Sequence, residues 1–401
     1  MERKKICVII GSSMNLFGLY RDQFKYLREN GYEVTGLAPA GEEHEWLRKQ
    51  GFNTKVIHLK RPPSIFHDLI SLCQLTLYLI FNRFDIINIS TPKASLIGSL
   101  AAYFTFHKNI VYNLRGRAYE MTNGKTRQFY EFIEKLICGI SSKVLCDSKE
   151  IRQDIIESGL CSEEKIKVFG SGSSNGVDLG KFTKNTDILE NGLRIRENLG
   201  IKENDILVLN SGRLRKDKGI NELVRSFNSI SKKYQNVHLL LQGKFETFDP
   251  LDKDVMKLIE SHSRIHQAGW VKKVEYYFAA ADIFAFPSHR EGFGNVAIEA
   301  SAMEIPVVAF NVIGCRESVK DNVSGILCTN IDHKSFEQGL ETLIKNDILR
   351  EDLGRKGRSR VESEFNSIKI WEQLLHEYNK VTEKGITRSE EHLFKIDDTN
   401  K

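Results

Sequence analysis

The chain has 401 residues and a net charge of +5, with 41% hydrophobic and 28% charged residues. This length exceeds what one ordinary hydrophobic core holds, and the composition is that of a soluble globular protein, so we expect two domains. The seven cysteines form no C-x-x-C pair, and an odd number cannot all form disulfides, which favours a reducing cytoplasm. Most of them lie in apolar runs and are interpreted as small core residues.

Strand and helix patterns alternate through the first half of the chain. The apolar run at residues 6–10 is too short for a signal peptide and leads into a glycine turn. Helices are predicted near residues 16–30, 94–106 and 128–138, and Ser148 is expected to cap a further helix with Ile151 at its third position. Strands are predicted for KICVIIG, YEVTGLAP, NTKVIHL, FDIINIS, NIVYNL, KVLCDS and KIKVFG. Such alternation predicts crossover connections and a parallel sheet covered on both faces.

The most apolar segment, residues 65–81, is predicted to be an amphipathic helix rather than a membrane span. We expect it to pack on the sheet of the first domain, with partial contact with a membrane surface as the alternative. Its polar residues fall on one helical stripe, which consists of His67, Asp68, Ser71, Gln74 and Tyr78.

A basic stretch follows at residues 93–127, where six Lys or Arg accompany the single acid Glu120. Such a stretch attracts anions, whether phosphates, acidic lipids or nucleic acid. Since no nucleic-acid-binding motif accompanies it, nucleic acid is not an expected partner.

The second half repeats the pattern, with strands predicted for DILVLNSG, VHLLLQG, IHQAGW, DIFAFPS, PVVAF and GILC. Between the halves, SGSSNGVDLGKFTKNTD is rich in Gly, Ser and Asn and is interpreted as a linker. We therefore place a first domain at residues 1–183 and a second at residues 200–365. A helix at residues 366–383 leaves the second domain, and the polar residues 384–401 are expected to form a mobile tail.

The predicted fold class is α/β, with two doubly wound Rossmann-like domains facing each other across a cleft. Ligands of such sheets bind at the carboxyl ends of the strands, where glycine loops and helix N-termini gather. The loops after Ile10, Leu114, Leu209, Leu241 and Phe286 are therefore the expected binding loops.

The sharpest motif is SHREGFGNVAIEA, which directly follows the strand DIFAFP. A strand, a glycine turn and a helix starting near Asn295 expose backbone N–H groups and the positive end of a helix dipole to an anion. Glu291 in the turn can accept hydrogen bonds from sugar hydroxyls, and Glu299, about one turn into the helix, can bind a ribose diol. Two solvated glutamates are the alternative, which the flanking Gly292 and Gly294 disfavour.

A second motif, NSGRLRKDKGI, follows the strand DILVL. Arg213 and Lys218 flank a turn that opens a helix, which is a geometry that places two cations on a diphosphate. Ordinary surface charge is the alternative. The D-x-D sequence at Asp252 and Asp254 follows a proline at a helix start rather than a strand end, and the histidines have no ligand spacing, so no metal is expected. A nicotinamide cofactor is not expected either, because the Gly170-Ser171-Gly172 turn lacks a third glycine and an opening helix.

Together these segments resemble the large family of retaining glycosyltransferases called family 4 or group 1, which have two Rossmann-like domains (the GT-B fold). The matching pieces, in the order of the family, are SGSSNGVDLGKF, GRLRKDKG, AGWVKKVEYYFAAADIFAFPS, EGFGNVAIEA, and PVVAFNVIGCRESV with SGIL. The resemblance implies that residues 1–183 bind the acceptor and residues 200–365 the nucleotide-sugar donor. It also implies that the helix at residues 366–383 crosses back to the first domain.

The resemblance also implies roles for single residues. Arg213 and Lys218 would hold the donor diphosphate, Glu299 the ribose, and Glu291 the donor sugar, so that Glu291, Arg213 and Lys218 are the expected catalytic residues. The full implied donor-binding set is Gly11, Arg213, Lys218, Trp270, Val271, Glu291, Gly292, Phe293, Gly294, Asn295 and Glu299.

The chain departs from the family at one position. Where the family often has a histidine after the fifth strand of its first domain, the sequence V-Y-N-L-R-G has Arg115. We interpret Arg115, with Asn113 and Arg117, as contacts to an acceptor or phosphate, because a guanidinium suits a diphosphate. A role in the fold is the alternative. The segments RGRAYEMTNGKTRQFYE and GSGSSNGVD resemble the branch that extends undecaprenyl-diphosphate-linked sugars for capsule or O-antigen.

The resulting hypothesis is a retaining hexosyltransferase that needs neither metal nor cofactor. It would move a hexose or N-acetylhexosamine from a nucleotide-sugar, UDP by the habit of the family, to a lipid-diphosphate-linked saccharide. We expect it in the cytoplasm, peripherally at the inner face of the cytoplasmic membrane. The alternatives are a UDP-sugar 2-epimerase, which uses the same two-domain shape, and a non-catalytic partner that binds a nucleotide or polysaccharide.

Overall fold

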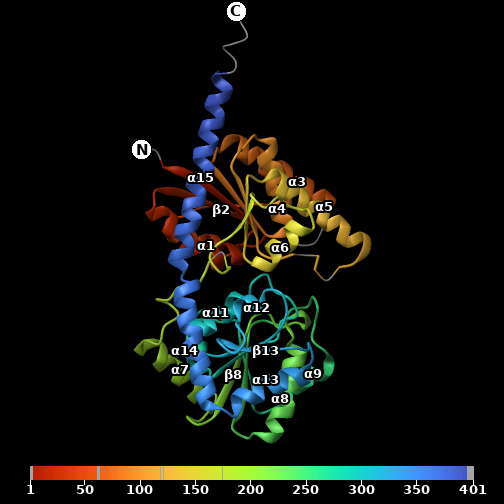
Figure 1. The fold of residues 1–401 in the computed structure, drawn as a ribbon, viewed down its shortest axis with the longest axis vertical. Helices are drawn as coiled ribbons and strands as arrows, with labels where there is room; N and C mark the ends of the chain where they lie inside the picture. Colours follow the sequence, from red (N-terminus) through yellow and green to blue (C-terminus); the bar gives the residue numbers. More distant parts are fainter. Residues whose placement is uncertain (1–2, 61–63, 118, 121, 174, 395–401) are drawn as a thin grey trace, which may run out of the picture. The chain divides into compact units, whose positions relative to one another are not determined.

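The computed structural model describes residues 3–60, 64–117, 119–120, 122–173 and 175–394, without the side chains of residues 384–394. The chain divides into two compact units, each built on one sheet (Figure 1). Unit 1 comprises Met1–Phe169, Ser173–Asn175 and Lys369–Lys401, and unit 2 comprises Gly170–Gly172 and Gly176–Ile368.

Unit 1 contains a seven-stranded parallel sheet in the order β3-β2-β1-β4-β5-β6-β7. Its strands are β1 (Lys4–Ile10), β2 (Tyr32–Ala38), β3 (Asn53–Val56), β4 (Ile86–Ser90), β5 (Ile110–Leu114), β6 (Lys143–Cys146) and β7 (Ile166–Val168). The connecting helices are α1 (Ser13–Glu29), α2 (Glu43–Lys49), α3 (Ile65–Phe81), α4 (Pro92–Phe104), α5 (Gly124–Ile140) and α6 (Lys149–Glu157). Parallel neighbours require such crossover helices, which cover both faces of the sheet.

Unit 2 contains a six-stranded parallel sheet in the order β10-β9-β8-β11-β12-β13. Its strands are β8 (Ile206–Ser211), β9 (Val237–Gln242), β10 (Ile265–Gly269), β11 (Ile283–Phe286), β12 (Val307–Phe310) and β13 (Gly325–Cys328). Its helices are α7 (Thr186–Asn198), the single 3₁₀ turn η1 (Lys216–Lys218), α8 (Ile220–Lys233), α9 (Lys253–Ser261), α10 (Val274–Ala280), α11 (Asn295–Ala302), α12 (Cys315–Ser318), α13 (His333–Ile344) and α14 (Asp347–Glu364). The two doubly wound α/β sheets confirm the predicted fold class.

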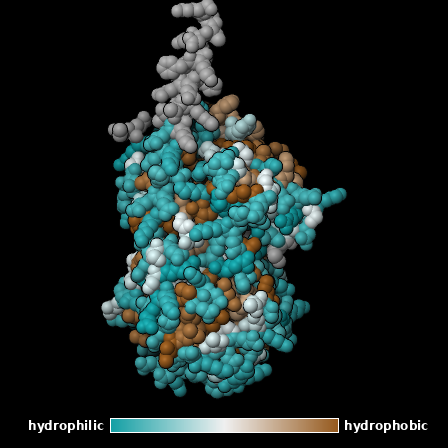
Figure 2. All heavy atoms as spheres, in the orientation of Figure 1, coloured by the Kyte–Doolittle hydropathy of each residue, from teal (hydrophilic) through white to brown (hydrophobic). Residues whose placement is uncertain are grey.

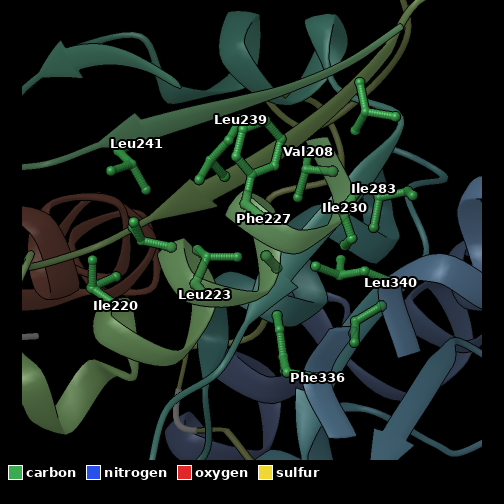
Figure 3. Close-up of a cluster of buried hydrophobic side chains, with 14 of the residues drawn as sticks. Val208, Ile220, Leu223, Phe227, Ile230, Leu239, Leu241, Ile283, Phe336 and Leu340 are labelled. Atoms are coloured by element: carbon green, nitrogen blue, oxygen red, sulfur yellow. The ribbon is translucent and has the colours of Figure 1, made fainter. Parts of the chain in front are cut away.

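The core of unit 2 lies on both faces of its sheet, because successive strand residues point to opposite faces. In β8, Val208 belongs to one buried cluster, whereas Leu207 and Leu209 belong to another. Figure 3 shows the first cluster, where Phe227 and Leu223 of α8 lie against the strands. These two apolar layers hold the strand ends, and the loops that follow them, in fixed positions.

The last helix, α15 (Ser367–Phe394), completes the core of unit 1. Trp371, Leu374 and Tyr378 are buried in one cluster with Ile6 of β1 and Leu16 of α1. The helix therefore fills one face of the first sheet, although almost 200 residues of unit 2 separate it from β7. It also continues through most of the predicted tail, of which residues 395–401 lie outside the described residues.

The predicted linker is divided between the units. Val177 forms an isolated parallel bridge with Asn366, and Phe182 is buried in the core of unit 2. Residues 176–183, which we had placed at the end of the first domain, therefore pack with unit 2.

Several local predictions can be compared directly with the structure. The Oγ atom of Ser148 accepts a hydrogen bond from the N–H of Ile151 at 3.1 Å, so the predicted helix cap is confirmed. None of the seven cysteines, all of which lie in the described residues, forms a disulfide, and all except Cys73 are buried, as expected of core residues. None of the helices in the described residues is long and apolar enough to cross a membrane.

Candidate active site

In each sheet the strand order reverses at one point, between β1 and β4 in unit 1 and between β8 and β11 in unit 2. The crossovers on either side of such a point go to opposite faces, so the two loops at the strand ends diverge and leave room for a ligand. In unit 2 these are the loops after Ser211 and after Phe286. They carry Arg213, Lys218 and Glu291, so three predicted residues meet at the reversal point of one sheet.

The loops after β8 and β11 are in direct contact through their backbones. The N–H of His289 donates to the carbonyl of Asp217 at 3.0 Å. Gly219 has a φ of 66°, and a Cβ atom there would lie only 1.9 Å from the carbonyl oxygen of Pro287. Only glycine tolerates both the left-handed backbone and this close approach. The glycine therefore fixes the distance between the two loops.

Lys218 and Glu291 form an ion pair across these loops. The Nζ atom of Lys218 lies 2.5 Å from Oε1 of Glu291, and the Oγ–H of Ser288 donates to the same oxygen at 2.7 Å. The two charged side chains are only 19% and 17% exposed. Since an ammonium group has three donors and Glu291 is the only recorded partner of Lys218 in the described residues, two N–H groups can bind another anion.

The two arginines of the loop after β8 have different environments. Arg215 is buried and forms an ion pair with Asp217 and a second one with Glu246, at 3.4 Å. Arg213 is 47% exposed, and its terminal nitrogen lies 3.6 Å from Glu246. Arg215 therefore stabilises the loop, whereas Arg213 has an accessible guanidinium.

The glycine turn after Glu291 leads into α11 with positive φ angles. Gly294 is the N-cap, with a φ of 82°, and a Cβ atom there would meet the ring of Phe286 at 2.8 Å. Gly314, which also has positive φ, packs so closely that its Cβ atom would lie 2.5 Å from the carbonyl oxygen of Glu291. The backbone between Glu291 and Asn295 is thus held tightly at the N-terminus of an eight-residue helix, where the helix dipole favours an anion.

The side chains of this turn point to different surroundings. Phe293 is buried in the core, 5.3 Å from Phe365 between ring centroids, so only its backbone is available to a ligand. Glu299 lies in the second turn of α11 and is half-buried, with no recorded hydrogen bond in the described residues. Burial raises the pKa of Glu299 to about 7, with nearby Lys181 lowering it and Glu275 raising it further. Its carboxyl group is therefore poorly solvated and has no hydrogen-bond donor among the residues that the structure describes.

Trp270 and Val271 follow β10, at the same edge of the sheet as Arg213. Backbone hydrogen bonds join these strand ends, because the N–H of Gly243 donates to the carbonyl of Gly269 at 2.8 Å and that of Gly212 to Gln242 at 2.9 Å. Trp270 is 50% exposed, and Val271 is half-buried. The structure thus brings together the predicted residues of unit 2 on the loops after β8, β10 and β11.

Of the predicted residues of unit 1, Gly11 lies at the reversal point, and the others lie on or after the neighbouring strand β5. The N–H of Gly11, after β1, donates to Oγ1 of Thr91, after β4, at 3.0 Å. A Cβ atom at Gly11 would lie 2.8 Å from that oxygen, so the position is tightly packed. Thr91 itself has a φ of 73°, which is rare for a β-branched residue and often marks a functional site.

Arg115 follows β5 at the same edge and is held in one orientation. Its Nε–H donates to Oγ of Ser90 at 3.1 Å, its Nη1 lies 3.6 Å from Asp147, and its guanidinium lies over the ring of Tyr20. The side chain is only 13% exposed, yet neither terminal nitrogen has a hydrogen-bond acceptor among the described residues. Burial without full pairing costs free energy, which is typical of a group that binds a ligand.

Asn113 and Arg117 differ from Arg115. The amide of Asn113 is buried and donates to Tyr20 at 3.0 Å and to Asn88 at 2.7 Å, so it supports the ring beneath Arg115. Arg117 is buried between Glu120 and Asp154, which both form ion pairs with it. Its charge is thus already balanced by two carboxylates, unlike that of Arg115.

Sequence reasoning missed some polar residues of these two sites. Ser288, which holds Glu291, and Asp147, which faces Arg115, each stand within two residues of the end of a strand. Their position at a strand end was a usable signal, because polar side chains there face the ligand edge of the sheet.

The described residues contain no group of three or more His, Cys, Asp or Glu side chains arranged to hold a metal ion. The D-x-D sequence lies at the start of α9, where Asp252 forms ion pairs with Lys216 and Arg225. Asp254 also forms an ion pair with Arg225, at 3.0 Å. Basic side chains of unit 2 therefore surround both carboxylates.

Comparison with known proteins gives two family matches that cover most of the chain. Residues 193–360 match the family described as glycosyl transferases group 1, and residues 21–181 match glycosyltransferase family 4. The capsular polysaccharide biosynthesis glycosyltransferase CapM of Staphylococcus aureus is 35% identical over 382 residues, which cover 94% of this chain and 98% of CapM.

A second relative is the UDP-Gal:α-D-GlcNAc-diphosphoundecaprenol α-1,3-galactosyltransferase of Escherichia coli. It is 24% identical over 314 residues, which cover 78% of this chain and 79% of the relative. Among solved structures, HepE of Anabaena in complex with UDP-glucose superposes with a TM-score of 0.76 at 19% identity, covering 94% of this chain and 99% of HepE. This last likeness concerns the fold alone.

Proposed function

The chain belongs to the group 1 family of glycosyl transferases and is a glycosyltransferase, and we propose that it extends a lipid-linked saccharide in the biosynthesis of a capsular or related surface polysaccharide. The donor is a nucleotide-sugar of a hexose or N-acetylhexosamine, with UDP as the nucleotide. The name of the S. aureus relative supports the pathway, and that of the E. coli relative supports the UDP donor and the diphosphoundecaprenol-linked acceptor.

The observation that carries the donor assignment is the pairing of Lys218 with Glu291 where β8 and β11 diverge. A diphosphate suits the positive set formed by Arg213, the N-terminus of α11 and the two N–H groups of Lys218 that have no partner in the described part of the chain. Glu291 contacts the hydroxyl groups of the sugar. Glu299 accepts hydrogen bonds from the ribose, and Trp270 with Val271 flanks the base.

In the reaction, the acceptor hydroxyl oxygen forms a bond to the anomeric carbon on the same face from which the diphosphate leaves. The bond between that carbon and the phosphate oxygen breaks, and its electron pair stays on the diphosphate, which takes up the hydroxyl proton. Lys218 and Arg213 stabilise the charge that grows on the departing phosphate. Attack from the leaving-group side retains the anomeric configuration, and no side chain is assigned as a covalent nucleophile.

Unit 1 binds the acceptor in this proposal. Ser90, Asp147 and Tyr20 fix the orientation of Arg115, and its two terminal nitrogens have no hydrogen-bond acceptor in the described part of the chain. The guanidinium therefore suits one phosphate of a lipid diphosphate. Gly11 lets the backbone after β1 approach the donor phosphate. A lipid-linked acceptor requires the protein to work at the inner face of the cytoplasmic membrane as a peripheral protein.

The test is a donor screen with purified protein in EDTA. UDP-, GDP- and ADP-sugars are each incubated with and without a membrane lipid extract that contains lipid-diphosphate sugars, and release of nucleoside diphosphate is measured. We expect one UDP-sugar to release UDP faster with the extract, and NMR of the product to give the same anomeric configuration as the donor. A folded protein that releases nothing would favour a binding partner, and an isomerised donor sugar would favour an epimerase. An inverted product would contradict the front-face mechanism.

A further inference from the structure

The polar stripe of helix α3 in unit 1 faces the rest of the unit, beside the buried Leu75 and Leu79. The Oδ1 atom of Asp68 lies 2.7 Å from Nζ of Lys93, and the Oε1 atom of Gln74 accepts from the N–H of His58 at 2.7 Å. The hydroxyl of Ser71 donates to the carbonyl of His58 in the same loop. Ser71 is buried, and the rest of the stripe is at least half-buried. A surface helix of a globular protein normally has its polar face in water and its apolar face on the core.

The opposite face of α3 is therefore apolar and exposed. We call it the α3 face and define it by Ile65, Phe66, Leu69, Leu77, Ile80 and Phe81, which are between 50% and 84% exposed. Asp68 is the only Asp, Glu, Lys or Arg in the helix, and it pairs with Lys93 of α4. Because the polar side is hydrogen-bonded to the loop after β3 and to α4, the apolar side cannot turn inward without breaking these bonds.

The apolar surface continues beyond α3. Helix α4 packs against both α3 and α5. Its last turn and the residues after it add Tyr103, Phe104 and Phe106, and α5 adds Phe129 and Phe132, all of them at least half exposed. Figure 2 shows hydrophobic side chains gathered over the part of unit 1 that carries these helices in Figure 1. Monomeric soluble proteins rarely expose contiguous apolar patches of such extent, and such patches mark an interaction surface.

The charges around this surface favour an anionic partner. In the described part of residues 60–140, the exposed charged side chains are Lys60, Arg83, Asp85, Lys108, Lys125 and Lys135, five basic against one acidic. Two copies of the chain that met through this surface would bring these like charges together. An anionic lipid surface would instead neutralise them while its acyl region accepted the aromatic and aliphatic side chains.

We propose that the α3 face is the surface on which the protein lies on an anionic lipid bilayer, with α3 in the plane of the interface. This inference deepens the proposed function, since it names the part of the chain that meets the membrane of a lipid-linked acceptor. The hydrogen bonds and the ion pair of Asp68, Ser71 and Gln74 keep the apolar side of α3 exposed. The protein therefore needs no conformational change to bind a bilayer through this surface.

The test measures binding of the full chain to vesicles without donor or acceptor. Sedimentation compares pure phosphatidylcholine vesicles with vesicles that contain roughly one quarter phosphatidylglycerol. The double variant L77E/F81E places two charges on the α3 face. The matched control I331E/I348E changes two isoleucines of unit 2, which are 51% and 81% exposed, against 57% and 81% for Leu77 and Phe81. All four positions are exposed, so we expect both variants to keep the melting temperature of the wild type.

We expect the wild type to bind the phosphatidylglycerol vesicles more strongly, L77E/F81E to lose about tenfold or more in partitioning, and the control to stay within about twofold. The variant K108E/K135E should reduce the preference for phosphatidylglycerol. The inference would be overturned if the wild type bound neither kind of vesicle. It would also be overturned if L77E/F81E bound the vesicles as strongly as the control. A wild-type dimer that L77E/F81E converts to a monomer would assign the surface to a second copy instead. Vesicle binding by a protein that fails the donor screen would leave this inference standing and remove the proposed function.

Discussion

Replacing Lys218 by alanine tests the proposed donor site most directly. The ammonium group is 19% exposed and would lie near the charge that develops on the departing phosphate. Two unit charges about 4 Å apart interact by about 4 kcal/mol at the effective dielectric constant of a partly buried site. Removal of a single donor to a developing oxyanion typically costs about 10²–10³ in kcat. We therefore expect Lys218→Ala to lower kcat/KM by about three orders of magnitude.

The loss has a second origin in the pairing of Lys218 with Glu291. Without Lys218, the carboxylate of Glu291 keeps only the hydroxyl of Ser288 and faces the donor phosphate with a like charge. The double variant K218A/E291A should therefore be less impaired than the sum of the two single variants predicts, because coupled neighbours are not additive.

The assay is release of nucleoside diphosphate at saturating acceptor, with Lys216→Ala as the matched control. Lys216 stands two residues away in the same loop, but its side chain is 46% exposed and pairs with Asp252. We expect this control to stay within about threefold of the wild type, since exposed ion pairs contribute little. Equal activity of Lys218→Ala and Lys216→Ala in folded protein would refute the assignment of Lys218 to the phosphate.

Three further substitutions test other parts of the structure. Gly219→Ala should lower the free energy of unfolding more than Gly159→Ala does. Both glycines have a similar positive φ, but only an alanine side chain at position 219 would meet the carbonyl of Pro287. Urea denaturation that gave equal losses of about 1–2 kcal/mol for the two variants would contradict the close approach. Glu299→Gln should raise the melting temperature at pH 8 but not at pH 4. Because the pKa of Glu299 is raised to about 7, the native state keeps a proton that the unfolded chain has lost, so the stability cost of Glu299 grows from about pH 4.5 to 7. An equal shift of the melting temperature at both pH values would disprove this reasoning. Arg115→Ala should raise KM for the lipid-linked acceptor by about tenfold and leave KM for the donor unchanged. If steady-state kinetics showed that KM for the donor rises instead, Arg115 would contact the donor.

Much of the fold followed from the sequence because the signals are local. Short apolar runs that end in glycine or polar residues predicted the strands, and the cap at Ser148 was visible from residue type and spacing alone. The loops that carry Lys218 and Glu291 were predicted at the ligand edge because each follows a strand of a parallel sheet, and the resemblance to the family placed both residues on the donor. Their ion pair shows that the two loops do meet.

Other features depended on contacts far apart in the chain. The polar stripe of α3 was predictable from its spacing, but its direction was not, because partners such as Lys93 come from another element. Arg117 was expected to contact a ligand, yet it is paired with Asp154, 37 residues away. The boundary near residue 176 also escaped prediction, since the bridge between Val177 and Asn366 and the burial of Phe182 in the core of unit 2 are contacts between residues far apart in the chain.

The packing of α15 on unit 1 determines which unit can complete its fold first during synthesis. The hydroxyl of Tyr378 accepts from the amide of Asn88, which in turn accepts from Asn113 beneath Arg115. These contacts, with Trp371 and Leu374, form only when the final helix has left the ribosome. The part translated first is thus completed last, while unit 2 can close its own core in the meantime. A fragment ending at residue 169 would lack one wall of its core, so the two halves of this enzyme are not interchangeable modules.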